Sequence, residues 1–393
     1  MSMNEGAVWK AAPENTLESL RHAFTMFDGV EFDIRLTADE QLIIHHDRTV
    51  SVPKEFLKGR SAWLEEWNLD ELVDLGFVNF EAFLDDPVVL KSWRDEGSMG
   101  CIEIKRPHPT SATGGGFLGR KKHNEHIAKV MKLAEAALDE RQIPKENTVF
   151  YAFHRGMPTS ARQAKTKRPW AALIPYIPPY GNRTTQRMQV FPKYLTTSFR
   201  RLVNQHRAQG SAMLPCAIEY FQNPTRHLPL GRHVGLTGAA LDRLTKARKG
   251  MPTYVWPTKP DIEHQLLRAG MSALTDYADP ELTWLPSGHA RWRQPALRPL
   301  LESEWATLQQ ATQEDHRAVV KELEKHVPRW SECDASRRRA LIGEWSQRWK
   351  WEDDVETMLA RFQNATPPAS APKMIGHRGS GKTPRPVLNP HSM

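Results

Sequence analysis

The stretch PENTLESLRHAFTMFDGVEFDIRLTADEQLIIHHD, residues 13–47, carries the strongest structural signal in this sequence. In its first part, Asn15 to Phe27, apolar side chains recur at a spacing near 3.6 residues, which predicts a helix with one apolar face. The next run, Val30 to Ile34, alternates apolar and acidic side chains and predicts a strand. We therefore expect a helix followed by a strand that ends in polar residues.

Working outward, similar short apolar runs alternate with helical patterns along most of the chain. Strand followed by helix, repeated, predicts parallel β-α-β units, and eight such strands predict an α/β fold of the (β/α)8 barrel type. The expected strands lie at residues 30–34, 101–105, 149–153, 171–174, 216–220, 253–256, 272–275 and 373–377, and further helices are expected at 123–141, 238–248 and 261–268.

Composition divides the chain into three parts. We expect the barrel to occupy residues 1–300, with a long insertion at 176–214 that is rich in Pro, Tyr, Arg and Gln. Residues 301–364 show amphipathic helical patterns and predict an added helical segment. Residues 365–393 predict a proline-rich linker that leads into the last barrel strand.

The overall composition excludes several classes of protein. Among 393 residues, 39% are apolar and 25% charged, which excludes a wholly disordered chain. No apolar run approaches the ~20 residues of a membrane span, and the N-terminal sequence predicts no secretory signal. Three widely spaced cysteines form no C-x-x-C motif and indicate a reducing, cytoplasmic environment. The oligomeric state is left open.

The net charge of +8 indicates an anionic partner. Nucleic acid, a membrane surface and a small anionic substrate all satisfy that condition. The basic residues are spread along the chain, and no basic repeat is interleaved with aromatic residues. We therefore expect a small anionic substrate and no nucleic acid, and we keep a nucleic-acid-binding protein as an alternative.

Three carboxylates predict a metal site. Glu31 and Asp33 lie two residues apart on one strand, so their side chains share a face. At the C-terminal end of a barrel strand, that face points into the mouth of the barrel. Two converging carboxylates repel each other unless a proton or a cation lies between them, and hard oxygen ligands suit Mg²⁺ or Ca²⁺. Glu103-x-Lys105 repeats this geometry and adds a third carboxylate and a cation for an anionic substrate.

These motifs resemble those of the glycerophosphodiester phosphodiesterase family. The resemblance covers roughly residues 12–280, with insertions, and follows the family's order and spacing closely through residue 47. It is weaker at 253–256 and 274–277, where Trp256-Pro257-Thr258-Lys259 replaces the family's Trp-Thr-Val-Asn. The motifs that carry the resemblance are Pro13-Glu14-Asn15-Thr16, Glu31-x-Asp33, His46-Asp47 and Glu103-Ile104-Lys105.

One family element is displaced. The family's first strand ends in His-Arg-Gly just before Pro-Glu-Asn-Thr, whereas here that motif occurs as His377-Arg378-Gly379. We predict a circular permutation, in which the C-terminal strand fills the gap between the strands at 30–34 and 272–275. Barrel closure makes the first and last strands neighbours, which favours such a rearrangement.

Two alternatives use overlapping residues. A second His-Arg-Gly, His154 to Gly156, directly follows a strand and is the competing catalytic copy. Residues 376–383 also match the phosphate-binding pattern G-x-x-x-x-G-K-[ST], which requires a helix after its Lys-Thr. Prolines at 384, 386 and 390 exclude that helix, so we interpret this match as accidental.

The resemblance implies a metal-dependent phosphodiesterase acting on a glycerophosphodiester-like substrate. Glu31, Asp33 and Glu103 would hold one divalent cation, while Arg378 and Lys105 bind the phosphoryl oxygens. His46 and His377 would form a general acid–base pair. The supporting residues are Glu14, expected beside the metal or His377, Asp47, expected to orient a loop, and the mouth residues Glu219, Trp256, His154 and Asp276, of which Glu219 and Trp256 are expected to bind substrate.

Other functions of the same barrel stay open. A related phosphodiester lyase would transfer the phosphoryl group within the substrate and release a cyclic phosphate. A non-catalytic barrel would bind an anionic ligand without turnover.

Overall fold

The computed structural model describes residues 10–57, 59–174, 182–221, 236, 238–280, 301–312, 315–325, 333–348 and 374–379. The chain forms two compact units, Met1–Glu281 with Pro368–Met393, and Leu282–Pro367. The second unit contains three described helices, which fall within the predicted helical segment: α12 (Glu302–Gln310), α13 (His316–Glu324) and α14 (Ala335–Arg348). The predicted linker before residue 373 and the prolines after residue 383 lie outside the described residues.

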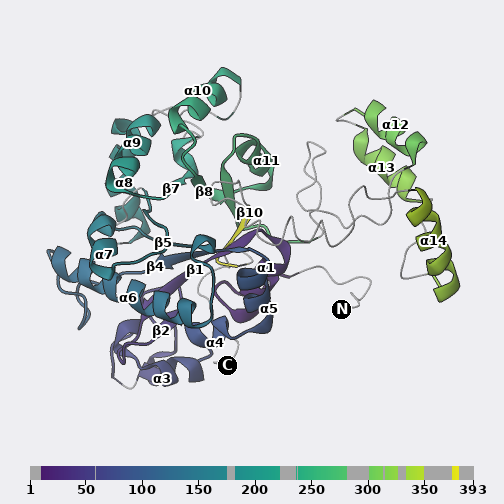
Figure 1. Ribbon diagram of the computed structural model, residues 1–393. Coiled ribbons are helices and arrows are strands. Elements are labelled where there is room, and N and C mark those ends of the chain that lie inside the picture. The colour runs from purple at the N-terminus through teal and green to yellow at the C-terminus, as the bar shows by residue number, and fades with distance from the viewer. Residues whose placement is uncertain are drawn as a thin grey trace. The chain divides into compact units, whose positions relative to one another are not determined.

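Eight parallel strands form the main path of a ten-stranded sheet in the first unit. Their order around the sheet is β6-β5-β4-β1-β10-β9-β8-β7. The two ends of this path meet, because Ile174, just past β6, bridges in parallel to Cys216 in β7. The predicted (β/α)8 barrel is therefore confirmed (Figure 1). The strands are β1 (Gly29–Leu36), β4 (Met99–Ile104), β5 (Thr148–Ala152), β6 (Trp170–Ala172), β7 (Leu214–Ala217), β8 (Thr253–Thr258), β9 (Ser272–Thr275) and β10 (Met374–His377).

Helices alternate with the strands along the chain, as the sequence pattern predicts. The first of them, α1, begins after Thr16, whose side chain accepts a hydrogen bond from the Ser19 N–H and caps the helix. Its apolar face, which includes Leu20 and Phe24, is buried. The helices of the barrel are α1 (Leu17–Met26), α6 (Arg120–Glu140), α7 (Met157–Ala164), α8 (Arg183–Thr196), α9 (Phe199–Gln209), α10 (Gly238–Arg248) and α11 (Pro260–Arg268).

A small subdomain follows β1. Its strand β2 pairs antiparallel with β1 and with β3, and its own apolar cluster includes Ile43, Leu64 and Trp67. It carries the His46-Asp47 motif directly after β2. Its elements are β2 (Leu42–Ile44), α2 (Lys54–Leu57), α3 (Leu69–Asp74), β3 (Val78–Asn79), α4 (Phe80–Leu84) and α5 (Pro87–Leu90).

Strand β10 lies between β1 and β9, in the gap where the sequence predicts a C-terminal strand. Gly29 pairs with Ile375 on one side, and Leu274 pairs with Ile375 on the other. The Ile375 side chain is fully buried in the apolar cluster that fills the barrel. The C-terminal strand is therefore part of the core. That this arrangement arose by circular permutation stays a prediction.

Two regions differ from the expected pattern. The predicted insertion at 176–214 contains α8 and α9, and the described part of α9 buries Phe199, Leu202 and Val203. The predicted strand at 216–220 is wrong beyond Ala217. There the Phe221 N–H donates to the Ile218 carbonyl oxygen at 2.9 Å, and the chain forms a short 3₁₀ turn over Ile218–Tyr220.

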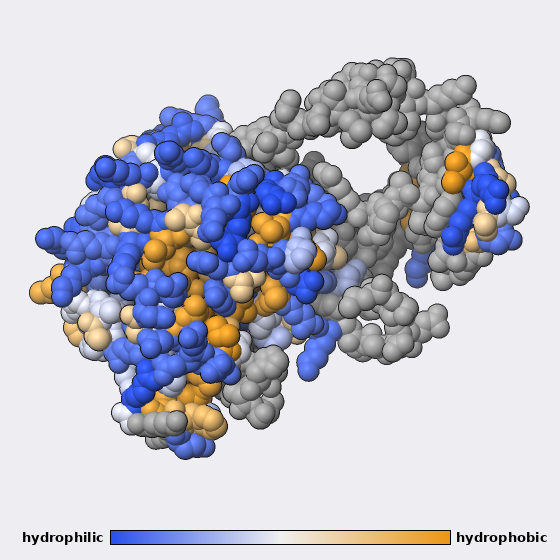
Figure 2. Space-filling view, turned by 60° about the horizontal axis from the view of Figure 1, so that its bottom comes forward, coloured by the Kyte–Doolittle hydropathy of each residue, from blue (hydrophilic) through white to orange (hydrophobic). Residues whose placement is uncertain are grey.

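The surface of the molecule is largely hydrophilic on the face seen in Figure 2, with apolar patches between the polar residues. Within the described ranges, every helix is too short or too polar to cross a membrane.

Candidate active site

Three acidic side chains converge at the ends of two adjacent strands. Glu31 and Asp33 come from β1 and Glu103 from β4, where Asp33 and Glu103 are register partners. Each residue exposes no more than 6% of its surface, and one carboxylate oxygen from each lies within 4.8 Å of the others. The structure thus brings together the three residues predicted to hold a metal.

Two cations neutralise part of this acidic cluster. The Lys105 Nζ lies 2.7 Å from Asp33 Oδ1 and also pairs with Glu103. The Arg378 Nε lies 3.6 Å from Asp33 Oδ2. The backbone N–H of Arg378 donates to Glu31 Oε2 at 3.1 Å, so β10 supplies both a charge and a hydrogen bond.

The three carboxyl groups differ in their affinity for protons. Burial, reinforced by the charge of Asp33, raises the pKa of Glu31 to about 8. Burial also raises the pKa of Glu103. Burial acts in the same direction on Asp33, but Lys105 and Arg378 outweigh it and hold the pKa of that carboxyl well below its usual value.

The charges of the cluster fit a divalent cation. With all five carboxylates ionised and His377 protonated, five negative charges face three positive charges, and two negative charges are left over. Buried charges of one sign are unfavourable unless a counter-charge is bound. The oxygen donors of the three carboxylates are those preferred by Mg²⁺ and Ca²⁺. The carboxylates are Glu14, Glu31, Asp33, Glu103 and Asp276.

The His377 imidazole lies between two carboxylates. Its Nδ1 is 2.6 Å from Asp276 Oδ1 and its Nε2 is 3.5 Å from Glu31 Oε2. Burial disfavours the charged ring, but Asp276 and Glu31 together outweigh burial and raise the pKa of His377. The sequence placed Asp276 near the mouth without a role, and the structure identifies it as the partner of His377.

The turn after β10 explains why glycine follows His377 and Arg378. Arg378 and Gly379 have φ values of 53° and 82°, a region that glycine adopts readily. A Cβ on Gly379 would lie 2.8 Å from the backbone carbon of Ser19, too close for any side chain. The Gly379 N–H donates to the Glu31 carbonyl oxygen at 3.2 Å, which fixes the turn against β1.

The Glu14-Asn15 pair ties this turn to the acidic cluster. The Glu14 carboxylate lies 3.3 Å from Arg378 Nη1, so it supports the arginine. Asn15 Nδ2 donates to Asp33 Oδ2 at 3.0 Å, while its Oδ1 accepts the Asp33 N–H at 3.2 Å. The N–H of Asn15 also donates to the Arg378 carbonyl oxygen at 3.2 Å. The loop before α1 therefore joins β1 to the C-terminal strand.

His46 has a similar carboxylate partner. Its Nδ1 lies 2.9 Å from Asp47 Oδ1, and about a quarter of its side chain is exposed. The buried guanidinium of Arg35 donates to the His46 carbonyl oxygen from Nη2 at 2.8 Å and from Nε at 3.3 Å. Arg35 follows Asp33 on β1 by two residues. The sequence alone indicates no role for it, because only the fold shows that β2 returns beside it.

The competing His-Arg-Gly motif has a different environment. His154 is buried, its Nε2–H donates to Asn124 Oδ1 at 2.6 Å, and its Nδ1 accepts from Arg106 Nη1 at 3.3 Å. Burial and the charge of Arg106 lower the pKa of His154 to about 3. Both ring nitrogens are thus engaged within the protein, which favours a structural role.

Two further residues predicted to bind substrate, Trp256 and Glu219, lie on β8 and just after β7. Trp256 is partly buried on β8, where its ring meets Phe153 edge to face at 5.6 Å between centroids. Glu219 lies in the 3₁₀ turn after β7, and its side chain is outside the described part of the structure.

The structure is thus a parallel β/α barrel with a buried triad of carboxylates, with Lys105 and Arg378 beside the triad. His46 and His377 each pair with an aspartate. Residues 7–167 match the model of the Glycerophosphoryl diester phosphodiesterase family. This match confirms the resemblance that the sequence motifs indicate.

Individual relatives are distant. An uncharacterized protein of Mycoplasma genitalium is 36% identical over 99 residues, which are 24% of this chain and 40% of the relative. The match thus spans less than half of that relative's length. A glycerophosphodiester phosphodiesterase from Thermotoga maritima is 18% identical, with 67% of this chain and 89% of that chain covered and a TM-score of 0.41. One from Parabacteroides distasonis is 17% identical, with 68% and 89% covered and a TM-score of 0.42.

Proposed function

We propose that the protein is a divalent-metal-dependent phosphodiesterase that cleaves a glycerophosphodiester-like substrate. The observation that carries the proposal is the union of two elements from opposite ends of the chain. Strand β1 supplies Glu31 and Asp33, and β10 places His377 and Arg378 against them. The family match over residues 7–167 supports the same activity.

The cation-binding residues would be Glu31, Asp33 and Glu103. A bound Mg²⁺ or Ca²⁺ supplies Lewis-acid chemistry, which polarises a phosphoryl oxygen. Arg378 and Lys105 line the same cluster and carry positive charge at its edge. They would bind the remaining phosphoryl oxygens and orient the diester, because charge-assisted hydrogen bonds to phosphate are strong and directional.

His46 and His377 would act as the general acid and base. Each ring directs Nδ1 to an aspartate, at 2.9 Å for His46 and 2.6 Å for His377. That hydrogen bond fixes the tautomer and leaves Nε2 to hold or accept a proton. One histidine takes the proton from the attacking hydroxyl, and the other protonates the leaving alkoxide. The attacking hydroxyl belongs to water or to the substrate itself.

We also propose a cytoplasmic location. The three cysteines are buried free thiols rather than disulfides. Such thiols are typical of proteins from reducing compartments.

The first experiment measures metal-dependent hydrolysis of a simple glycerophosphodiester with the full chain, with and without a chelator. Glu31→Gln and Asp33→Asn should abolish both the activity and the calorimetric binding of the metal. Glu263→Gln is the control, because Glu263 is a buried carboxylate outside the triad whose Oε1 accepts from the Thr275 hydroxyl. Retained metal binding in both triad variants would contradict the proposed site.

A second comparison separates the two His-Arg-Gly copies. His377→Ala should abolish hydrolysis, whereas His154→Gln should leave kcat within about tenfold of the original protein. The reverse result would assign catalysis to the copy after β5. ³¹P NMR of the products distinguishes hydrolysis from release of a cyclic phosphate. Substrate binding without turnover in the intact protein would instead identify an anion-binding barrel.

A further inference from the structure

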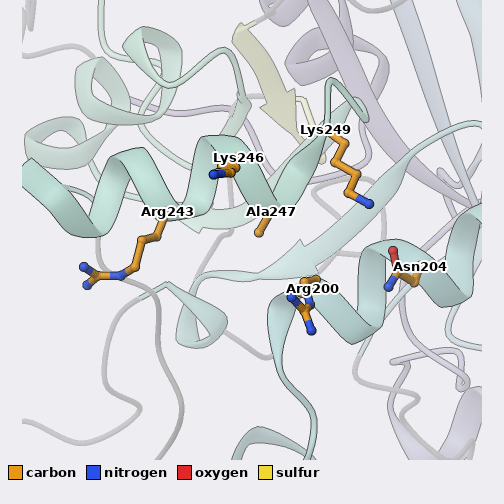
Figure 3. A pocket seen from close by; sticks show the side chains of 6 residues that line it. All are labelled: Arg200, Asn204, Arg243, Lys246, Ala247 and Lys249. Carbon is orange, nitrogen blue, oxygen red and sulfur yellow. The ribbon is translucent and has the colours of Figure 1, made fainter.

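A basic pocket lies on the outside of the barrel between α9 and α10 (Figure 3). Its volume is about 360 Å³. Figure 3 shows side chains from the two helices on either side of the same space. Six residues line it: Arg200 and Asn204 from α9, Arg243, Lys246 and Ala247 from α10, and Lys249 just after α10.

The lining of this pocket has an unbalanced charge. Four of its six residues are cationic, and the other two are an amide and an alanine. Among the described residues, no carboxylate forms an ion pair with any of the four cations. Helix α9 contributes no acidic residue at all. Like charges that converge without a counter-charge repel one another, so this pocket favours an anion.

The contacts that fix α9 and α10 in place do not use the side chains of the four lining cations. Helix α9 buries Leu202 and Val203, and α10 buries Leu244, so both helices are anchored by their apolar faces. The Arg207 guanidinium donates to the Lys249 carbonyl oxygen and joins the ends of the two helices. Arg248 donates to the Gly270 carbonyl oxygen from Nη1. The basic residues of the lining are therefore free for a ligand.

We propose that this pocket is a second anion site, which binds a small molecule bearing several phosphate groups. Its volume falls in the range of small-ligand pockets, which matches a compact polyanion. Its lining contains no aromatic residue on which nucleic-acid bases could stack, so a small polyphosphate is favoured over a single-stranded nucleic acid. None of its residues belongs to the carboxylate cluster, and the proposal therefore stands independently of the phosphodiesterase activity.

Inorganic tripolyphosphate is the probe that tests this site. Binding is measured by isothermal titration calorimetry with the full chain, in the presence of a chelator so that no divalent metal bridges the anion to the carboxylates. We expect the double variant Arg243→Gln/Lys246→Gln to weaken binding by about tenfold or more, because two of the four cations are removed. Raising the salt concentration should weaken binding by the original protein as well.

A matched variant controls for net charge. Lys121→Gln/Lys132→Gln also removes two positive charges, but from α6, where both lysines are exposed. It should change tripolyphosphate affinity less than twofold. An equal loss of tripolyphosphate affinity in both double variants would show that the effect comes from net charge alone, and would overturn the proposed site. So would absence of tripolyphosphate binding, whether or not a single-stranded oligonucleotide binds to the same surface.

Discussion

His377 and Asp276, 101 positions apart in the chain, meet at 2.6 Å between Nδ1 and Oδ1. The contact exists because β9 and β10 are adjacent parallel strands, so the residues at their C-terminal ends emerge side by side. An imidazole held in this way by a carboxylate presents its other nitrogen in a fixed direction. The His377–Asp276 contact therefore links β10 to β9 through side chains, in addition to the backbone hydrogen bonds between the two strands.

Removing the charge of Asp276 should impair catalysis without disrupting the metal site. We expect Asp276→Asn to lower kcat by on the order of 10²- to 10⁴-fold, because an amide can stabilise the wrong tautomer of His377. Steady-state kinetics on the glycerophosphodiester measure the effect, and calorimetry should show metal binding close to that of the original protein. An unchanged kcat would remove the His377–Asp276 pair from the mechanism.

Divalent metal should stabilise the folded protein. A ligand that binds only the folded state adds about 2.7 kcal/mol to the free energy of unfolding at a concentration one hundred times its Kd. We expect Mg²⁺ or Ca²⁺ to raise the thermal midpoint of the original protein and to leave that of Glu31→Gln unchanged. An equal rise in both proteins would place the stabilising metal somewhere other than the triad.

Gly379 should be intolerant of a side chain. Gly379→Ala adds a Cβ 2.8 Å from the Ser19 backbone, whereas Gly210→Ala adds one at a similar φ with its nearest neighbour 3.9 Å away. The φ penalty alone is roughly 1 kcal/mol, and crowding adds ~1–3 kcal/mol at residue 379 only. Denaturant unfolding of both variants separates these effects. Equal destabilisation would show that the turn after β10 moves away from α1 without loss.

Acid should destabilise the fold through His154. Its pKa lies at about 3 in the folded protein and near 6.5 when unfolded, so the unfolded chain binds more protons in between. This contribution is present above pH 6.5 and is lost progressively as the pH falls towards 3. Between pH 6.5 and 5 the free energy of unfolding should drop by about 2 kcal/mol from this group. Denaturant titrations at both pH values should show a smaller drop in His154→Gln.

The strand periodicity was sufficient to predict much of the fold and the acidic cluster. Glu31 and Asp33 share a face because alternate residues of a strand do so, and Glu103 joins them because parallel strands end at one edge. The acidic residues at those strand positions were therefore enough to predict the cluster. The same local logic failed at Glu219, because a turn stabilised by one backbone hydrogen bond is not encoded in an apolar run.

Local sequence patterns could not predict contacts between segments that lie far apart in the chain. Arg35 contacts the His46 carbonyl oxygen, and Asp276 contacts His377. Both contacts depend on which loop lies beside which strand, and the residue types alone do not predict them. Asn15 was part of a quoted motif, but its two hydrogen bonds to Asp33 follow from its backbone at φ 59°, which only the folded loop reveals. The subdomain after β2 was likewise unpredicted, since its helices are too short to show a period.

The position of β10 also has a consequence for protein synthesis. Residues 276–373 separate β9 from β10, so a growing chain on the ribosome carries two unpaired strand edges, on β1 and β9, throughout the translation of that segment. Open edges of this kind invite pairing with other chains, which makes the nascent barrel a natural client for chaperones. Until translation passes residue 379, moreover, Glu31 and Asp33 lack Arg378, and a prematurely terminated product has neither a closed barrel nor a complete site.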